Sequence, residues 1–138
     1  QFKKKTNMKR RIQLLAIALL ACTATFAQVE KIVGDWTTVD DNSGKKVSIV
    51  RIYKENGAYF GKIIKLLDPS ANPKSLGELV IRDMKEKKDH LACGRVYDPK
   101  SGNTYHGTVK YNADKNTLTL RGSIDKFGML GRSQTWVK

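Results

Sequence analysis

The fold class is decided by the stretch Thr104-Tyr105-His106-Gly107-Thr108-Val109-Lys110-Tyr111, which is followed after a turn by Thr117-Leu118-Thr119-Leu120-Arg121. In the first segment Tyr105, Gly107, Val109 and Tyr111 share one face, and polar side chains occupy the other. In the second segment the two leucines oppose the threonines and the arginine. A period of two is typical of strands with one buried face and one wet face. We therefore expect an antiparallel hairpin here.

The rest of the chain from Gly34 onward repeats this design in short β-favouring runs, separated by turns that contain Gly or Asn. We expect strands over residues 34–39, 45–53, 58–66, 78–84, 91–97, 103–111, 117–123 and 129–137. Eight such strands predict one all-β domain, a small antiparallel up-and-down β-barrel, with an open β-sandwich as the alternative. The loop over 68–75, which contains two prolines, is expected at the barrel mouth. A short helix within 77–88 is the alternative to the fourth strand.

The first 27 residues resemble an export signal. Met8 is the expected initiator, so residues 1–7 lie upstream and outside the fold. The basic triplet Lys9-Arg10-Arg11 precedes an apolar run from Leu14 to Cys22, and the small-x-small end Thr25-Phe26-Ala27 follows. This order predicts a signal peptide over 8–27, cleaved before Gln28, and a periplasmic or secreted domain over 28–138. The run is shorter than the ~18 apolar residues of a spanning helix.

A lipoprotein is the alternative form of export. Leu19-Leu20-Ala21-Cys22 resembles a bacterial lipobox, in which Cys22 would carry the lipid anchor. If cleavage instead occurs before Gln28, Cys93 is the remaining cysteine and no internal disulfide can form. We expect Cys93 to be a buried small hydrophobe, with intermolecular pairing as the minor alternative.

The basic charge of the chain is concentrated at its beginning. Six of the 26 Lys and Arg residues, and none of the 13 acidic ones, lie in residues 1–27. Residues 28–138 therefore carry 20 bases against 13 acids, a net charge of +7. Such a charge suits an anionic envelope surface, for example lipid headgroups or acidic glycans. It is not specific for nucleic acid, which an exported protein rarely meets, and an inert basic surface is the alternative.

The sequence offers no catalytic or metal-binding pattern. His90 and Cys93 are three residues apart and would face opposite sides of a strand, and His106 lies on a polar face. No Gly-x-Ser-x-Gly is present, and Ser133 has no base near it in the sequence. We therefore predict a protein that is not an enzyme, with no catalytic residue, no metal site and no cofactor.

Two functions remain for such a barrel, which we expect to be monomeric. An eight-stranded barrel is just wide enough to be filled by side chains or to hold one small ligand. In the first hypothesis Tyr105, Val109, Tyr111, Leu118 and Leu120 line a site for a small apolar or amphipathic molecule; alternatively they only form the core. In the second hypothesis the protein is an envelope interaction module that uses its basic outer surface. A cavity would favour the first, and a filled interior with an exposed apolar patch the second.

Residues near both ends of the predicted barrel resemble the lipocalin-like (calycin) family. Gly34-Asp35-Trp36 opens the first strand, and Gly131-Arg132 with Trp136 closes the last. The resemblance implies that Trp36 plugs the closed end of the barrel and that Arg132 packs over its ring as a cation–π pair. Arg132 and Trp136 are four apart and share a strand face, as this structural role would require.

A wider pattern resembles domain of unknown function family 2147, small exported bacterial proteins with a lipocalin-like fold. The matching residues are Gly34-x-Trp36, Asp41-x-x-Gly44, Ile52-Tyr53, Gly57, Tyr59-Phe60-Gly61-Lys62-Ile63, Gly77, Gly94-x-x-x-Asp98-Pro99-x-x-Gly102-x-x-Tyr105, Leu120-x-Gly122 and Gly131-Arg132-Ser133-Gln134-Thr135-Trp136. The resemblance implies fold and export and brings no activity with it. Many relatives carry a cysteine pair in the loop after the third strand, which here contains no cysteine.

Overall fold

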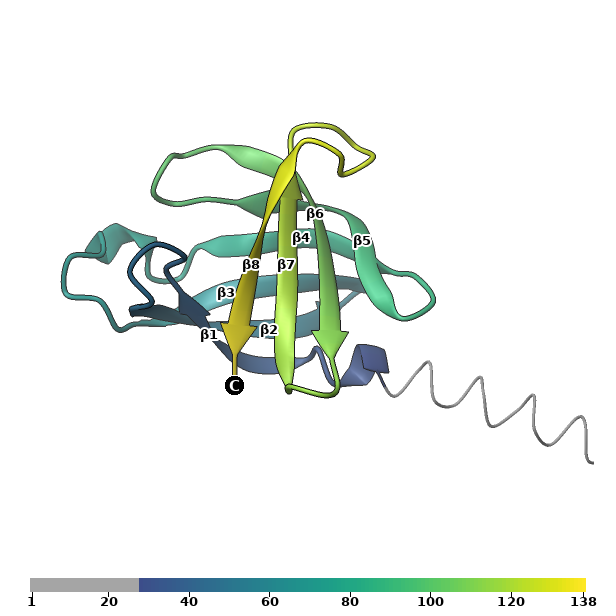
Figure 1. Cartoon of the computed structure of the whole chain (residues 1–138), viewed down its shortest axis with the longest axis horizontal. Coiled ribbons are helices and arrows are strands. Elements are labelled where there is room, and N and C mark those ends of the chain that lie inside the picture. Colours follow the sequence, from purple (N-terminus) through teal and green to yellow (C-terminus); the bar gives the residue numbers. More distant parts are fainter. Residues whose placement is uncertain (1–27) are drawn as a thin grey trace, which may run out of the picture.

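The alternating segments form strands that pair in chain order and close into an antiparallel barrel (Figure 1). The computed structural model describes residues 28–138. The strands are β1 (Gly34–Val39), β2 (Lys46–Glu55), β3 (Ala58–Leu66), β4 (Leu79–Glu86), β5 (His90–Tyr97), β6 (Thr104–Asn112), β7 (Thr117–Ser123) and β8 (Gly131–Val137). A short 3-10 helix, η1 (Pro73–Ser75), lies in the proline-containing loop. The predicted eight-stranded barrel is confirmed.

The closed sheet also decides between the alternatives. The open β-sandwich is wrong, because β1 pairs with β8 and joins the two edges of the sheet. The helix within 77–88 is wrong as well, because those residues enter β4, which pairs with β3 and β5. The predicted signal peptide, the upstream residues and Cys22 lie outside the described residues. Within residues 28–138, no helix is long and apolar enough to cross a membrane.

One end of the barrel is closed by the segment before β1. Residues 28–30 form a helical turn, and Val29 within it and Ile32 just after it are buried. Trp36 is fully buried, and its indole Nε1 donates a hydrogen bond of 2.8 Å to the carbonyl oxygen of Ile32. The ring of Tyr111 meets that of Trp36 edge to face, with centroids 6.2 Å apart. Trp36 therefore plugs the closed end, as the resemblance implied.

The predicted partner of Trp36 is wrong. Lys138, not Arg132, lies over the indole, with Nζ 4.4 Å from the ring centroid. The Arg132 side chain is 81% exposed, and its Nη2 is 3.9 Å from Oδ2 of Asp41. The reason is the register between β1 and β8, which pairs Thr37 with Val137. This register brings Lys138 opposite Trp36, whereas Arg132 lies six residues away along the strand, a distance of about 20 Å.

The seam between β1 and β8 is short. Thr37 and Val137 are the residue pair that joins the two strands, whereas β7 pairs with β8 at every position from Thr117↔Val137 to Ser123↔Gly131. Residues 131–135 are all exposed, so both faces of this half of β8 are open to solvent. The first half of β8 is therefore held by β7 alone.

The predicted burial of Cys93 is also wrong, because the side chain is exposed. Cys93 has a positive φ of 60°, and Asp83 on the neighbouring strand has a φ of 54°. Both residues interrupt the regular pairing between β4 and β5, which resumes at Arg82↔Arg95 and Lys85↔Ala92. This irregularity turns Cys93 outward, while Gly94 and Leu91 face the core.

Candidate functional site

Three of the five residues predicted to line a ligand site belong to the packed core. Val109 and Leu118 have no exposed surface, and Leu120 is 5% exposed. Glycines on the inner face increase the packing, because the space that a side chain at Gly107 would occupy is filled by Val96 and Met84. The inner face at the closed end is thus filled by protein, and these three residues form its core.

The fourth predicted residue, Tyr111, lies at the boundary of this core. Its ring is partly buried and packs against the core cluster. Its hydroxyl donates a hydrogen bond of 2.9 Å to Oδ1 of Asn116 in the turn between β6 and β7. Tyr111 therefore connects the plug of the barrel with the adjacent turn.

The fifth predicted residue, Tyr105, lies at the other end of the barrel, which we call the mouth. The mouth is formed by the ends of β1, β3, β5 and β7 and the loops that follow them. Tyr105 is half-buried and packs over Gly122, whose Cβ position would lie 3.4 Å from Cβ of Tyr105. Gly122 pairs with Gly107 on one side and with Arg132 on the other. Because Gly122 has no side chain, the Tyr105 ring can lie over it on the inner face. Tyr105 in β6 and Arg132 in β8 are separated by β7.

The inner face of β8 changes from buried to exposed within four residues. Trp136 is 3% exposed, whereas Gln134 and Arg132, which follow it on the same face toward the mouth, are exposed. Nε1 of Trp136 donates a hydrogen bond of 3.3 Å to Oε1 of Gln134. At 3.9 Å, the carboxylate of Asp41 is a weak partner for an exposed guanidinium. The donors of Arg132 thus remain accessible to an anion.

Tyr105, Gln134 and Arg132 form the candidate site, which we call the mouth site. It combines an aromatic ring, an amide and a guanidinium on inward-facing positions of β6 and β8. Sequence reasoning assigned Arg132 to the wrong end of the barrel and did not single out Gln134. The period-two spacing from Trp136 to Gln134 and Arg132 places all three on one face, but the register of the seam decides which of them the protein covers.

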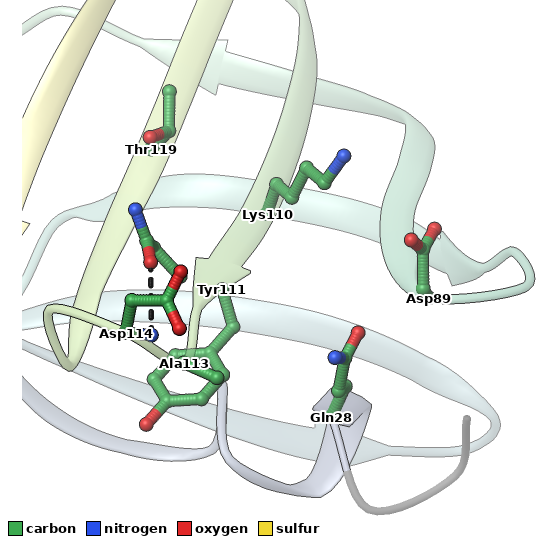
Figure 2. A pocket seen from close by; sticks show the side chains of 8 residues that line it. Gln28, Asp89, Lys110, Tyr111, Ala113, Asp114 and Thr119 are labelled. Atoms are coloured by element: carbon green, nitrogen blue, oxygen red, sulfur yellow. Dashed lines mark hydrogen bonds between the residues drawn. The ribbon is translucent and has the colours of Figure 1, made fainter. Parts of the chain in front are cut away.

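A depression lies on the outside of the barrel near its closed end, away from the mouth site (Figure 2). Its volume is about 390 Å³, and its lining residues are Gln28, Asp89, Lys110, Tyr111, Asn112, Ala113, Asp114 and Thr119. The lining is mostly polar and charged. Nδ1 of His90 lies 2.9 Å from Oδ1 of Asp89, and this hydrogen bond lowers the pKa of that carboxyl. A wide depression with a mostly polar and charged lining offers little apolar surface on which to hold a ligand firmly.

Several polar and titratable groups outside these two places make structural contacts. Tyr59 is buried, and burial together with a hydrogen bond to the Glu86 carboxylate raises its pKa. Nη1 of Arg95 lies 3.1 Å from Nδ1 of His106 on the outer face. Ser133 Oγ accepts a hydrogen bond of 3.3 Å from Nη1 of Arg121, a guanidinium that cannot act as a general base. Among residues 28–138, no group of three or more His, Cys, Asp or Glu side chains could hold a metal ion.

Comparison with known proteins agrees with the barrel and its residues. The profile of the DUF2147 family, described as an uncharacterized protein conserved in bacteria, matches residues 34–138. The chain belongs to this family. A solved structure of protein HP1028 from Helicobacter pylori, described as belonging to the lipocalin family, is similar with a TM-score of 0.63 and 25% identity, over 77% of this chain and 81% of that chain. No curated protein matches the sequence significantly. The predicted family and its lipocalin-like fold are confirmed.

Proposed function

We propose that this protein is an exported, non-catalytic binding protein that holds a small amphipathic molecule at the mouth site. The observation that carries the proposal is the change along β8, where Trp136 is 3% exposed and the Arg132 side chain on the same face is 81% exposed. A ligand at this place would contact inward-facing groups without displacing the core. The filled closed end argues against a ligand held between Val109 and Leu118.

The chemistry of the mouth site favours a molecule with an anionic head and an apolar body. The guanidinium of Arg132 suits a carboxylate, with which arginine forms two parallel hydrogen bonds. The Gln134 amide can donate a further hydrogen bond. The ring of Tyr105 over Gly122 offers apolar surface next to these donors. A fatty acid is the simplest molecule that combines these properties.

Export is the second part of the proposal. It is supported by the order of charged, apolar and small residues in 8–27, and its products are a domain beginning at Gln28 or a lipoprotein anchored at Cys22. The intact mass of the protein from the envelope fraction distinguishes the two. An uncleaved chain in the cytoplasm would contradict both.

Ligand binding is tested with laurate and, as a cation of equal chain length, dodecyltrimethylammonium. We expect native mass spectrometry and calorimetry to show one laurate bound per chain and no binding of the cation. Arg132→Ala should weaken laurate binding about tenfold, the loss of one charge-assisted interaction in an exposed place. Lipid extraction of the purified protein followed by mass spectrometry would identify a co-purified natural ligand.

Arg95→Ala is the matched control, because Arg95 is an exposed arginine on the outer face. It should bind laurate like the parent. Equal losses in Arg95→Ala and Arg132→Ala would show a general charge effect and would contradict the mouth site. Laurate binding that survives both Arg132→Ala and Tyr105→Ala would contradict it as well.

A second candidate function, an envelope interaction module, is favoured by one specific observation. The filled interior is accompanied by an exposed apolar patch on the loop between β7 and β8. This patch adjoins the mouth site at Arg132 and leads to a separate inference.

A further inference from the structure

The loop that joins β7 to β8 exposes large apolar side chains to water. Ile124, Phe127, Met129 and Leu130 are 74%, 80%, 81% and 66% exposed. In Figure 1 this loop projects beyond the ends of β7 and β8, away from the other loops of the mouth. Four such residues within seven positions form an apolar tip, which is unusual for a surface that contacts only water.

The exposure follows from a hydrogen-bonded backbone. The carboxylate of Asp125 accepts hydrogen bonds from the amides of Met129 and Leu130, at 3.1 and 2.8 Å. The amide of Ile124 donates to the carbonyl oxygen of Leu130 at 2.9 Å. These bonds hold the two ends of the loop together and leave the apolar side chains pointing outward. The exposed position of the apolar tip is therefore fixed by hydrogen bonds within the loop.

Two further contacts fix the turn. Nε of Arg121 donates a hydrogen bond of 2.8 Å to the carbonyl oxygen of Gly128, which has a φ of +77°. The hydroxyl of Ser123 donates to the carbonyl oxygen of Asp125 at 2.7 Å. A positive φ suits glycine, because other residues meet steric strain there. The loop conformation thus depends on side chains of β7 as well as its own.

The surroundings of the apolar tip are basic. Lys126 lies within the tip, with Nζ 5.5 Å from the ring centroid of Phe127, and Arg121 and Arg132 lie at its base. On the outer face, Gly131 pairs with Ser123, and the same line of paired residues continues across β6 and β5 to His106 and Arg95. The acid in the loop is Asp125, whose charge is engaged by backbone amides. An apolar tip surrounded by basic side chains is complementary to a bilayer with anionic headgroups.

We propose that the β7–β8 loop inserts its apolar tip into the interface of a membrane that contains anionic lipids. The apolar side chains would enter the boundary between headgroups and acyl chains, while Lys126 and the arginines at the base contact phosphates. The tip projects beyond the ends of β7 and β8, so a protein partner would need a cavity that matches it. A lipid surface adapts to such a tip without a matching cavity.

Insertion is tested by co-sedimentation with vesicles of phosphatidylethanolamine, with or without phosphatidylglycerol. We expect the parent protein to bind when phosphatidylglycerol is present and to be released by high salt. The double variant Phe127→Ser, Met129→Ser should bind at least about tenfold more weakly, because two large apolar side chains no longer enter the interface. Leu76→Ser is the matched control, since Leu76 is 54% exposed on the β3–β4 loop, and it should bind like the parent.

A spectroscopic measurement separates insertion from surface attraction. The variant Phe127→Trp should show a blue-shifted emission on anionic vesicles and quenching by brominated lipids, above the signal of Trp36 and Trp136 in the parent. Because the tip is exposed, all variants should unfold at the temperature of the parent, which thermal melts verify.

Several results would overturn the proposal. They are equal vesicle binding by the parent and the double variant, binding without quenching of Trp at position 127, and no binding to anionic vesicles. Self-association of the parent that the double variant abolishes, with no vesicle binding, would assign the tip to a second copy of the chain. The proposal does not depend on ligand binding at the mouth site, and Tyr105→Ala combined with Phe127→Trp should retain insertion, measured by quenching of the tryptophan at position 127.

Discussion

At the residue scale, Trp36 combines three interactions at the closed end of the barrel. Its indole donates to Ile32, meets the ring of Tyr111 edge to face and lies under Nζ of Lys138. The ring fills the space between the helical turn over residues 28–30 and the core, so no neighbouring side chain can replace it. The Lys138 ammonium over the ring lies at the surface and contributes less to stability, because water can take its place.

Stability measurements distinguish the plug from the residues around it. We expect Trp36→Ala to lower the free energy of unfolding by about 3–5 kcal/mol, the range for a large aromatic side chain leaving a core. Arg132→Ala should change it by less than about 0.5 kcal/mol, because the side chain is exposed and its ion pair is long. Urea denaturation followed by fluorescence or circular dichroism checks both. A loss in Arg132→Ala comparable with that in Trp36→Ala would contradict the register of the seam.

The two residues also show what could be predicted from the sequence. The burial of Trp36 was implied by the resemblance to lipocalin-like barrels, which the Gly34-x-Trp36 motif carries. The identity of the residue above it does not, because it depends on the register between β1 and β8, strands at opposite ends of the chain. Lys138 carries no sequence signal for this contact beyond its charge. The mouth site was partly missed for the same reason.

At the scale of elements, the pairing of β4 with β5 depends on a glycine. A Cβ atom at Gly94 would lie 2.5 Å from the carbonyl oxygen of Arg82 and 2.8 Å from the backbone of Met84. Real Cβ atoms do not approach backbone so closely, and backbone cannot move aside as a flexible side chain can. Gly94 thus permits the close approach of the two strands between the left-handed residues Asp83 and Cys93.

A pair of glycine substitutions tests this close approach. Gly94→Ala should lower the free energy of unfolding by about 1–3 kcal/mol, the usual cost of overpacking. Gly122→Ala is the control, because its Cβ would meet Cβ of Tyr105 at an ordinary 3.4 Å and should change stability little. Chemical denaturation of the two variants gives the comparison. A similar free energy of unfolding in the two variants would mean that β4 and β5 can move apart at position 94 with no loss of stability.

The β7–β8 loop should respond to acid. Backbone hydrogen bonds from Leu130 and Met129 lower the pKa of the Asp125 carboxyl in the folded loop. A lowered pKa means that the carboxylate stabilises the loop above the unfolded value near ~3.9 and that this stabilisation is lost as the pH falls through the folded pKa. We therefore expect the amide shifts of both residues to titrate together below that pH. NMR titration measures them, and Asp125→Asn should abolish the transition while leaving the spectrum of β6 unchanged.

At the scale of the whole molecule, the strand positions and the closed barrel were largely predictable, whereas the register and length of the seam were not. The bounds of β1, β3 and β7 agree with the predicted ranges, because alternation and turn residues are local signals. The outward turn of Cys93 was missed, because a positive φ at a cysteine has no sequence pattern. The seam was also unpredictable, since a single pair at Thr37 and Val137 leaves most of β8 without a partner on that side.

The short seam should be visible in hydrogen exchange. Along Gly131–Thr135, amides directed toward β7 are paired, whereas those directed toward β1 face solvent. We expect protection to alternate along this half of β8, and strong protection at His106, Gly107, Val109 and Lys110 of β6, which pair with strands on both sides. Exchange followed by NMR resolves single amides. Uniform protection from Gly131 to Thr135 would show that the strands meet along their full length.

The chain-order pairing of the strands sets an order of events in folding. Within residues 28–138, each ladder other than the seam joins strands that are neighbours in the chain, so it can form as a hairpin with little loop entropy. The seam joins residues 37 and 137, a hundred positions apart, and must wait until the sheet has curled. A substitution at Thr37 should therefore speed unfolding and leave the folding rate nearly unchanged, which corresponds to a φ-value near zero. The last contact made is the first one lost, so the barrel should open as a sheet before it unravels as a chain.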